Sequence, residues 1–287
     1  MQIHPEMIFD RNNWSLAVTR LYKFINNFPV NRGDINNNKV LIILGCQRSG
    51  TSLIYWIFER DFNTKIYREK SLLNNRDHEG LRLNPTYQIL KEFSKYDKKL
   101  IVIKPLVESQ NANLLLHRIP NSKIIWMYRN YNDVVLSNIK AFGINNGIND
   151  IKPIVNNNRK NWRCQRVSKE TQSIINKYFS TTMNPFDAAA LFWFVRNRFF
   201  FEQRLDQNKN VMLCRYEDLV YQPEPVVKNI YDFIGYHYPG KRITNGIHTK
   251  SVGKGCKVNL SPKISQLCDE ILRKLEDNYR HTVRHNL

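Results

Sequence analysis

The sequence has no long apolar run. None of its apolar stretches approaches the roughly eighteen residues that a helix needs to cross a membrane. The start of the chain includes Glu6 and Asp10 and lacks the apolar segment of a secretory signal. We therefore expect a protein without a transmembrane segment, and a cytoplasmic location is the simplest interpretation.

Cysteine is scarce and its positions show no pairing. The chain has five cysteines, an odd number, and no two of them form a C-x-x-C pair. This distribution argues against a disulfide framework and against a zinc ribbon. The histidines, His248 among them, are not spaced like metal ligands either. We expect reduced thiols that lie mostly in the core, and no bound metal.

Acidic residues are few compared with basic ones. The chain holds 25 Asp and Glu against 44 Lys and Arg, which gives a formal net charge of +19. The excess occurs in both halves of the chain, so it does not form a basic tail, and nucleic acid is not expected as a partner. Such a charge favours polyanions, acidic membranes or phosphorylated small molecules, and it does not choose among them.

Short apolar runs alternate with helical patterns along most of the chain. The runs typical of buried strands are residues 40–44, 100–103, 123–127 and 211–213. The helical patterns are residues 52–60, 86–96, 111–118, 132–142, 186–205, 223–234 and 261–279. This alternation predicts the α/β class, with a central parallel sheet covered by helices on both faces.

Two regions depart from this alternation. Residues 1–38 combine an amphipathic pattern around residues 14–25 with an asparagine-rich stretch, so we expect a helical lead and a linker before a single domain at residues 39–287. Residues 144–160 are also rich in asparagine and lack periodicity. They are predicted to form a long surface loop or an ill-ordered insertion.

Polar residues gather directly after the first strand. Residues 45–52 read Gly-Cys-Gln-Arg-Ser-Gly-Thr-Ser, which has the G-x-x-x-x-G spacing of a phosphate-binding loop at the start of a helix. The backbone N–H groups of such a loop and of the helix N-terminus bind anions. Thr51 stands where nucleotide hydrolases carry a lysine, and the cation is Arg48, inside the loop. A tight turn without a ligand is the alternative interpretation.

The third strand ends on a second candidate anion site. Arg129 lies at the tip of the strand, and Ser137 lies in the following helix, which Asn132 or Asp133 is expected to cap. A guanidinium can bind two oxygens of one anion, and a hydroxyl can add a third contact. Ligands of open parallel sheets bind at the carboxyl ends of the strands, so two anion sites there suggest a nucleotide bisphosphate. The alternative is a surface arginine and an unrelated helical serine.

The second and fourth strands end on less specific residues. Lys104 follows the second strand, and its side chain either points into the cleft or reaches solvent. Tyr216 follows the fourth strand and could stack on a base or belong to the core, while Glu217 or Asp218 could hold nearby backbone.

Taken in order, these strand-end residues resemble the sulfotransferases that use 3′-phosphoadenosine-5′-phosphosulfate (PAPS). The resemblance extends from about residue 40 to the carboxyl end of the chain. It implies a P-loop NTPase-like three-layer fold for residues 39–287. It also implies sulfuryl transfer from PAPS, release of adenosine 3′,5′-bisphosphate (PAP), and no metal.

The resemblance also implies roles for individual residues. The first loop would hold the 5′-phosphosulfate, Arg129 and Ser137 would hold the 3′-phosphate, and Tyr216 would lie near the adenine. Residues 250–255 resemble a loop that this family folds over the 3′-phosphate. The residues so assigned to the donor are Gln47, Arg48, Ser49, Gly50, Thr51, Ser52, Arg129, Ser137, Tyr216, Ser251 and Lys254.

The sequence departs from the cytosolic small-molecule sulfotransferases at the catalytic base. Those enzymes have Lys-Thr-His after the second strand of the series above, whereas Lys104 here precedes proline and leucine. The arrangement is more similar to the tyrosylprotein and glycan sulfotransferases, some of which use a glutamate after a short strand. Glu69, after a predicted strand at residues 65–67, is the expected base, and a surface carboxylate is the alternative. Glu108 and His78 are reserves, and Arg48 and Lys104 complete the expected catalytic set.

The acceptor is expected to be a small molecule or a glycan, with an acidic glycan as one option. Residues 76–84 and 144–162 and the aromatic helix with Phe192, Trp193, Phe194 and Phe199 are the predicted lining of its pocket. Two other functions stay open. A nucleotide or small-molecule kinase would need a lysine after Gly50 and a metal-holding aspartate, and a non-catalytic polyanion-binding protein would need clustered basic faces. Within the family, an inactive homologue is a further alternative.

Overall fold

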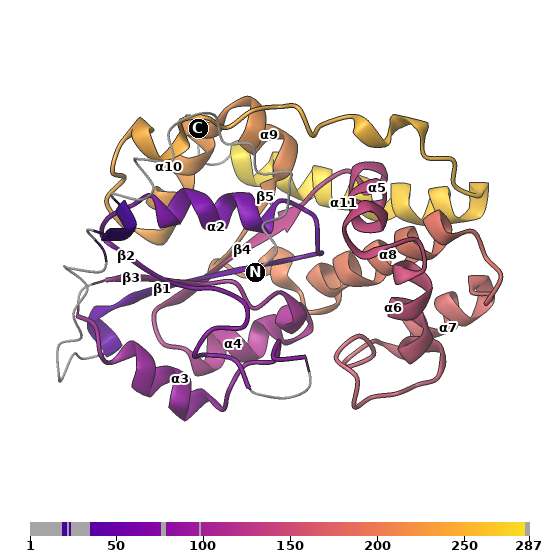
Figure 1. The fold of residues 1–287 in the computed structure, drawn as a ribbon, viewed down its shortest axis with the longest axis horizontal. Helices are drawn as coiled ribbons and strands as arrows, with labels where there is room; N and C mark the ends of the chain where they lie inside the picture. The colour runs from indigo at the N-terminus through magenta and orange to yellow at the C-terminus, as the bar shows by residue number, and fades with distance from the viewer. Residues whose placement is uncertain (1–18, 22, 24–34, 76–78, 98, 285–287) are drawn as a thin grey trace.

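Five parallel strands form the centre of the molecule. The computed structural model describes residues 19–21, 23, 35–75, 79–97 and 99–284. The strands are β1 (Lys39–Gly45), β2 (Thr64–Tyr67), β3 (Leu100–Ile103), β4 (Ser122–Tyr128) and β5 (Val211–Arg215), in the order β2-β3-β1-β4-β5 (Figure 1). All neighbouring strands pair in parallel, so their carboxyl ends lie at one edge of the sheet.

Helices cover both faces of this sheet. In β1, Val40 and Ile42 belong to one apolar core and Leu41 and Ile43 to the other, as expected for a strand buried on both sides. The first core is built with α3 (Thr86–Phe93), α4 (Ala112–Arg118), α5 (Tyr131–Phe142), α8 (Pro185–Glu202) and α11 (Pro262–Arg284). The second is built with α2 (Thr51–Glu59), α9 (Tyr216–Tyr221) and α10 (Pro223–Ile234). The predicted three-layer α/β fold is confirmed.

The prediction of a loop or ill-ordered insertion at residues 144–160 is wrong. This region contains α6 (Asn146–Val155), and α7 (Lys169–Tyr178), which the sequence pattern also did not reveal, comes after it. Ile151 and Ile154 of α6 are fully buried in the core that also includes α8. Asparagine and the internal Pro153 lower the intrinsic helix preference, and burial of the two isoleucines outweighs this.

The helix ends reflect local chemistry. Asn184 caps α8 by accepting a hydrogen bond from the backbone N–H of Phe186 at 2.9 Å, and Gly235 ends α10 in the left-handed conformation. The expected cap of α5 was wrong by two or three residues. Asn130 accepts the bond from Asn132 N at 3.0 Å, so the side chain of Asp133 is available for other contacts.

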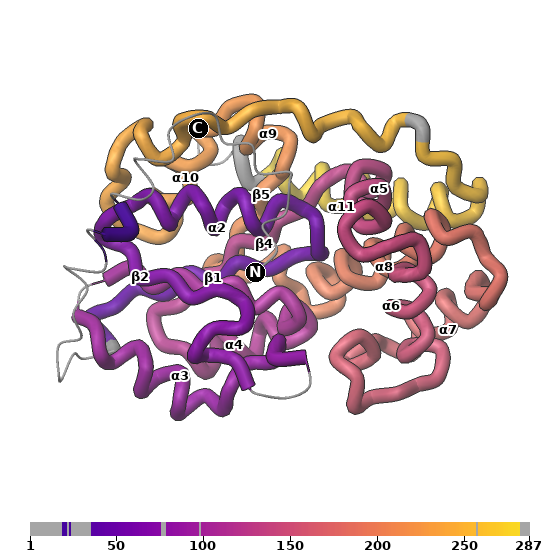
Figure 2. Tube along the Cα trace, in the orientation of Figure 1, coloured from indigo at the N-terminus to yellow at the C-terminus, as the bar shows by residue number. Residues whose placement is uncertain are grey.

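Long irregular segments complete the chain. The short 3₁₀ helices are η1 (Ile35–Asn37), η2 (Leu106–Asn111), η3 (Leu205–Gln207), η4 (Lys241–Thr244) and η5 (Lys254–Lys257). Figure 2 shows the segment between α10 and α11 crossing the upper side of the molecule before α11 returns beneath it. Most of the predicted helical lead lies outside the described residues. Within them, no helix is both long and apolar enough to span a bilayer.

Four of the five cysteines are buried and Cys256 is exposed. Burial raises the pKa of the Cys46 thiol to about 12, which suppresses its reactive thiolate at neutral pH. We therefore expect a coloured disulfide reagent to react rapidly with one thiol in the native protein and with all five after unfolding in guanidinium chloride. Cys256→Ser should remove the fast reaction, and a second fast thiol in that variant would contradict the packing described above.

Candidate active site

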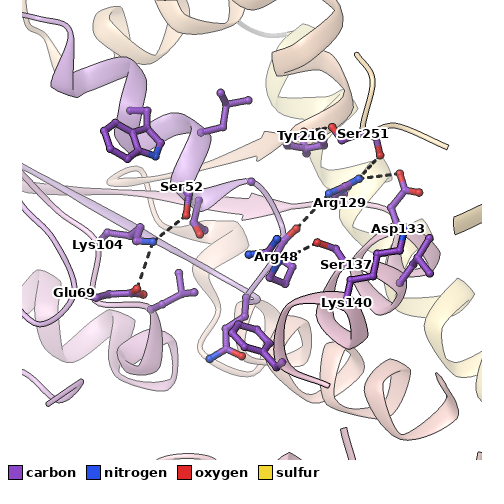
Figure 3. A pocket seen from close by; sticks show the side chains of 18 of the residues that line it. Arg48, Ser52, Glu69, Lys104, Arg129, Asp133, Ser137, Lys140, Tyr216 and Ser251 are labelled. Atoms are coloured by element: carbon purple, nitrogen blue, oxygen red, sulfur yellow. Dashed lines mark hydrogen bonds and ion pairs between the residues drawn. The ribbon is translucent and has the colours of Figure 1, made fainter. Parts of the chain in front are cut away.

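All five strands direct residues from their carboxyl ends into one cavity of about 530 Å³. Glu69 comes after β2, Lys104 comes after β3, and the loop of residues 46–50 joins β1 to α2. Arg129 comes after β4, and Tyr216 directly after β5. Figure 3 shows these side chains converging from separate elements. The parallel sheet therefore brings the predicted residues together.

The cavity wall includes all but one of the predicted site residues. They are Gln47, Arg48, Gly50, Thr51, Ser52, Glu69, Lys104, Arg129, Ser137, Tyr216, Ser251 and Lys254. Ser49 is the exception, since its side chain is fully buried and its backbone N–H donates to Cys46 O at 3.2 Å. The Ser49 hydroxyl has no hydrogen-bond partner within the described part of the chain.

The loop after β1 has the geometry of an anion-binding turn. Gly50 precedes α2 with φ +93°, and a Cβ there would lie 2.2 Å from Cδ2 of Tyr216, so only glycine fits between the loop and this ring. The helix then begins at Thr51. Leu53 N and Ile54 N donate to Gly50 O at 2.9 and 3.2 Å, whereas the N–H groups of Thr51 and Ser52 precede these first helical bonds and can face an anion. Arg48 leaves the loop sideways, and its Nε donates to Ser137 Oγ of α5 at 2.9 Å.

Lys104 joins the first turn of α2 to Glu69. Its Nζ donates to Ser52 Oγ at 3.1 Å and lies 3.5 Å from Oε2 of Glu69 (Figure 3). The lysine side chain is 11% exposed and the glutamate side chain 31% exposed. Lys104 thus points into the cavity and not toward solvent, and Glu69 keeps access to a ligand.

The segment after Lys104 rests on a buried arginine of α8. Arg196 donates to Leu106 O at 3.1 Å and to Oε1 of Gln110 at 3.0 Å. Burial lowers the pKa of its guanidinium to about 10, which still leaves it charged at neutral pH. These bonds fix the backbone of η2 directly after Lys104.

The reserve base Glu108 is occupied elsewhere. Its carboxylate is buried and accepts bonds from Arg82 Nε and Asn111 Nδ2, both at 2.6 Å. It is absent from the cavity wall, so its role is to hold the loop around it. The other reserve, His78, lies outside the described residues.

Arg129 is the centre of a second cluster. Its side chain is 7% exposed, its Nη2 lies 3.2 Å from Oδ2 of Asp133, and it donates to Ser251 O. The guanidinium lies over the Tyr216 ring, 4.4 Å from the centroid, and the Tyr216 hydroxyl contacts Ser251 Oγ. Little of this ring is available to stack on a base. The tyrosine instead holds Arg129 against the loop at Gly50.

The cavity wall also contains residues that the sequence analysis did not assign. Asp133 and Lys140 lie four residues before and three residues after Ser137, so helical spacing could have indicated both. The prediction about the aromatic helix was wrong, because Phe192, Trp193, Phe194 and Phe199 are buried in the core. Of the other predicted lining, Leu81 of residues 76–84 belongs to the wall, whereas no residue of 144–162 does. The remaining unassigned residues of the wall are Leu53, Trp56, Lys70, Leu106, Val107, Leu136, Phe142, Gly246, Ile247 and His248.

The charge and polar chemistry of the cavity suit a polyanion. Arginine and lysine outnumber carboxylates in its wall: Arg48, Lys70, Lys104, Arg129, Lys140 and Lys254 against Glu69 and Asp133. Nε of Arg129 is buried and lacks a hydrogen-bond partner within the described ranges, so it can serve a ligand. In the same ranges, no group of three or more His, Cys, Asp or Glu could hold a metal ion.

Most of the chain matches a known protein family. The model of the sulfotransferase domain matches residues 38–278. The chain belongs to the sulfotransferase family. Membership supports sulfuryl transfer as the class of reaction. None of the curated protein sequences compared with this sulfotransferase matches it.

Solved sulfotransferase structures resemble it at low sequence identity. The sulfotransferase domain of the Synechococcus PCC 7002 olefin synthase is 15% identical, with a TM-score of 0.48 over 85% of this chain and 97% of that domain. A mouse sulfotransferase in complex with PAP is 16% identical, with a TM-score of 0.46 over 90% and 89%. A sulfotransferase from Alicyclobacillus acidocaldarius is 13% identical, with a TM-score of 0.46 over 89% and 97%.

Proposed function

We propose that this sulfotransferase moves a sulfuryl group from PAPS to a hydroxyl or amine of an acceptor. The contact of Lys104 with both Ser52 and Glu69 carries the proposal. Through Lys104, the Glu69 carboxylate lies close to Ser52 and to the loop that could hold a phosphosulfate. This carboxylate can accept a proton. Such an arrangement suits group transfer, whereas binding alone would need no carboxylate there.

The two basic clusters divide the donor between them. The loop from Gln47 to Ser52 and the first turn of α2 are proposed to bind the 5′-phosphosulfate, with Ser49 as a buried support. Arg129, Ser137, Ser251 and Lys254 are proposed to bind the 3′-phosphate. The Arg48–Ser137 hydrogen bond connects the two clusters across the cavity.

Residues of the chain have distinct tasks during transfer. When bound, PAPS supplies the sulfuryl group and leaves as PAP. Glu69 accepts the proton of the acceptor group as that group attacks, and Lys104 keeps the carboxylate oriented. Arg48 and Lys104 stabilise the negative charge that develops on the leaving phosphate. Sulfuryl transfer mainly requires that donor and acceptor are aligned, and the residues at the strand ends provide this alignment.

The acceptor side of the cavity is proposed to lie near Glu69. Leu81, Leu106 and Val107 belong to the wall there, and Lys70 adds a cation for an acidic acceptor. The carboxylate base makes the enzyme closer to the tyrosylprotein and glycan type than to the histidine type. We also propose that residues 39–287 form one catalytic domain and that the enzyme works in the cytoplasm.

Binding and turnover together test this function. The purified protein should bind PAP in isothermal titration calorimetry, and it should transfer labelled sulfate from PAPS to a member of a panel of phenols, glycans, lipids and peptides. Tighter binding of ATP with Mg²⁺ than of PAP would favour the kinase alternative. PAP binding without transfer to any acceptor would favour a non-catalytic protein, and absence of PAP binding would refute the proposal.

A further inference from the structure

A short segment near the carboxyl end packs directly on the first turn of α5. We call residues 251–255 the strap. Two of its members, Ser251 and Lys254, line the cavity next to Arg129. The strap therefore forms the side of the cavity that the proposed function assigns to the 3′-phosphate, and it must be held in place for these side chains to reach a ligand.

Asp133 makes the contacts that hold the strap. Its Oδ1 accepts a hydrogen bond from the backbone N–H of Gly255 at 2.6 Å, and its Oδ2 accepts one from the N–H of Gly253 at 2.9 Å. The side chain is buried, and Oδ2 also lies 3.2 Å from Nη2 of Arg129. The two bonded amides flank Lys254, so they fix the backbone from which this cavity-lining side chain extends.

The approach of strap and helix is too close for any side chain at residue 255. A Cβ on Gly255 would lie 2.2 Å from the backbone carbon of Asn132 and 2.3 Å from its oxygen. These are backbone atoms of α5, which cannot move aside without disturbing the helix. A Cβ at this position would therefore displace the strap and leave the charge of the site unchanged.

The negative charge of Asp133 allows two possible roles of this residue to be distinguished. A carboxylate beside Arg129 opposes the binding of a phosphate there, because like charges repel at short range. If Asp133 served only as a counter-ion, its neutralisation would strengthen phosphate binding. If it holds the strap, neutralisation would weaken binding, because an amide cannot accept hydrogen bonds at both positions.

We propose that Asp133 is a positioning residue that holds the strap over the donor site, so that Ser251 and Lys254 can reach the 3′-phosphate. This proposal rests on the proposed function for the identity of the ligand. The contacts between Asp133 and the strap do not depend on it. If the strap is docked for only part of the time, the apparent affinity equals the affinity of the docked state multiplied by the docked fraction.

Two variants test the strap by independent routes. Asp133→Asn removes one hydrogen bond to the strap, and Gly255→Ala displaces the strap while keeping Asp133. Both should weaken PAP binding in calorimetry by about tenfold or more, since a hydrogen bond to a charged group is lost or disrupted. Adenosine 5′-monophosphate, which lacks the 3′-phosphate, should be affected much less. Hydrogen exchange of the Gly253 and Gly255 amides should be faster in both variants without any ligand.

Asp187→Asn is the matched control. Asp187 is also buried and accepts a bond from the backbone N–H of Ser261 at 2.9 Å, just beyond the strap, yet it is absent from the cavity wall. This variant should keep the wild-type affinity for PAP. Tighter or unchanged PAP binding in Asp133→Asn, or unchanged binding in Gly255→Ala, would overturn the proposal.

Failure of the proposed function gives a different result. In that case the wild-type protein binds no PAP, while amide exchange still reports whether Asp133 holds the strap. Unchanged exchange in both variants would refute the positioning role whatever the ligand. If Asp133→Asn does not fold, unchanged PAP binding in Gly255→Ala still overturns the proposal, because that variant displaces the strap and leaves every charge in the site intact.

Discussion

Arg129→Ala should strongly weaken the binding of PAP in calorimetry. The guanidinium is nearly buried and is held by Tyr216 and Asp133, and its Nε has no partner among the described residues and can serve a ligand. Each hydrogen bond between a charged group and its partner contributes about 1.5–3 kcal/mol. Loss of this charge-assisted contact with a phosphate should therefore weaken binding by roughly tenfold to a hundredfold.

The same substitution can also weaken the fold, so controls are needed. Removing one member of a buried ion pair typically destabilises a protein by about 3–5 kcal/mol. Arg129→Lys keeps the charge but loses the planar fork, and it should bind PAP with intermediate affinity. Arg118→Ala, on an exposed residue of α4 outside the cavity, should change nothing. A folded Arg129→Ala protein with wild-type affinity would remove Arg129 from the donor site.

Glu69→Gln should stop sulfuryl transfer while preserving PAP binding. The amide keeps nearly the same shape, but it cannot accept the acceptor's proton. A general base usually contributes about a hundred- to ten-thousandfold to the rate, and a loss of that size is expected in a single-turnover assay with labelled PAPS. Glu69 lies beside Lys104, at the opposite side of the cavity from Arg129 in Figure 3, so donor affinity should change little.

The control for this variant is a distant glutamate. Glu170→Gln, on an exposed residue of α7 that pairs with Arg198, should keep full activity. Turnover that survives in Glu69→Gln would mean that another group accepts the proton. Glu108 would be a poor candidate even then, because Arg82 and Asn111 already occupy its carboxylate.

The strands and their ends could be predicted because their signal is local. Residues 100–103 form β3 as predicted, since four consecutive apolar residues between polar clusters suit a strand buried on both faces. The parallel topology then places Glu69, Lys104, Arg129 and Tyr216 at one edge without further information. The polar residues at the carboxyl ends of the strands were therefore enough to locate the cavity and about half of its wall.

Features that depend on distant contacts could not be predicted in this way. The helix α6 forms because Ile151 and Ile154 are buried in the core, which overrides its asparagine-rich composition. The role of Asp133 depends on two glycines about 120 positions later in the chain. Nothing in the local pattern distinguishes such a carboxylate from an ordinary residue of a first helical turn.

The strap also has a consequence for the order in which the protein folds. All five strands have been synthesised once the chain reaches Arg215, so the sheet can assemble before the strap exists. Asp133 and Gly255 are 122 positions apart, and contacts across such long loops form late because closing the loop is entropically unfavourable. A growing or truncated chain that ends before residue 251 would therefore contain every strand of the sheet, but it would lack the strap and also α11, which covers part of the first core. Assembly of the sheet and completion of the cavity wall by the strap are therefore separate steps in the formation of this protein.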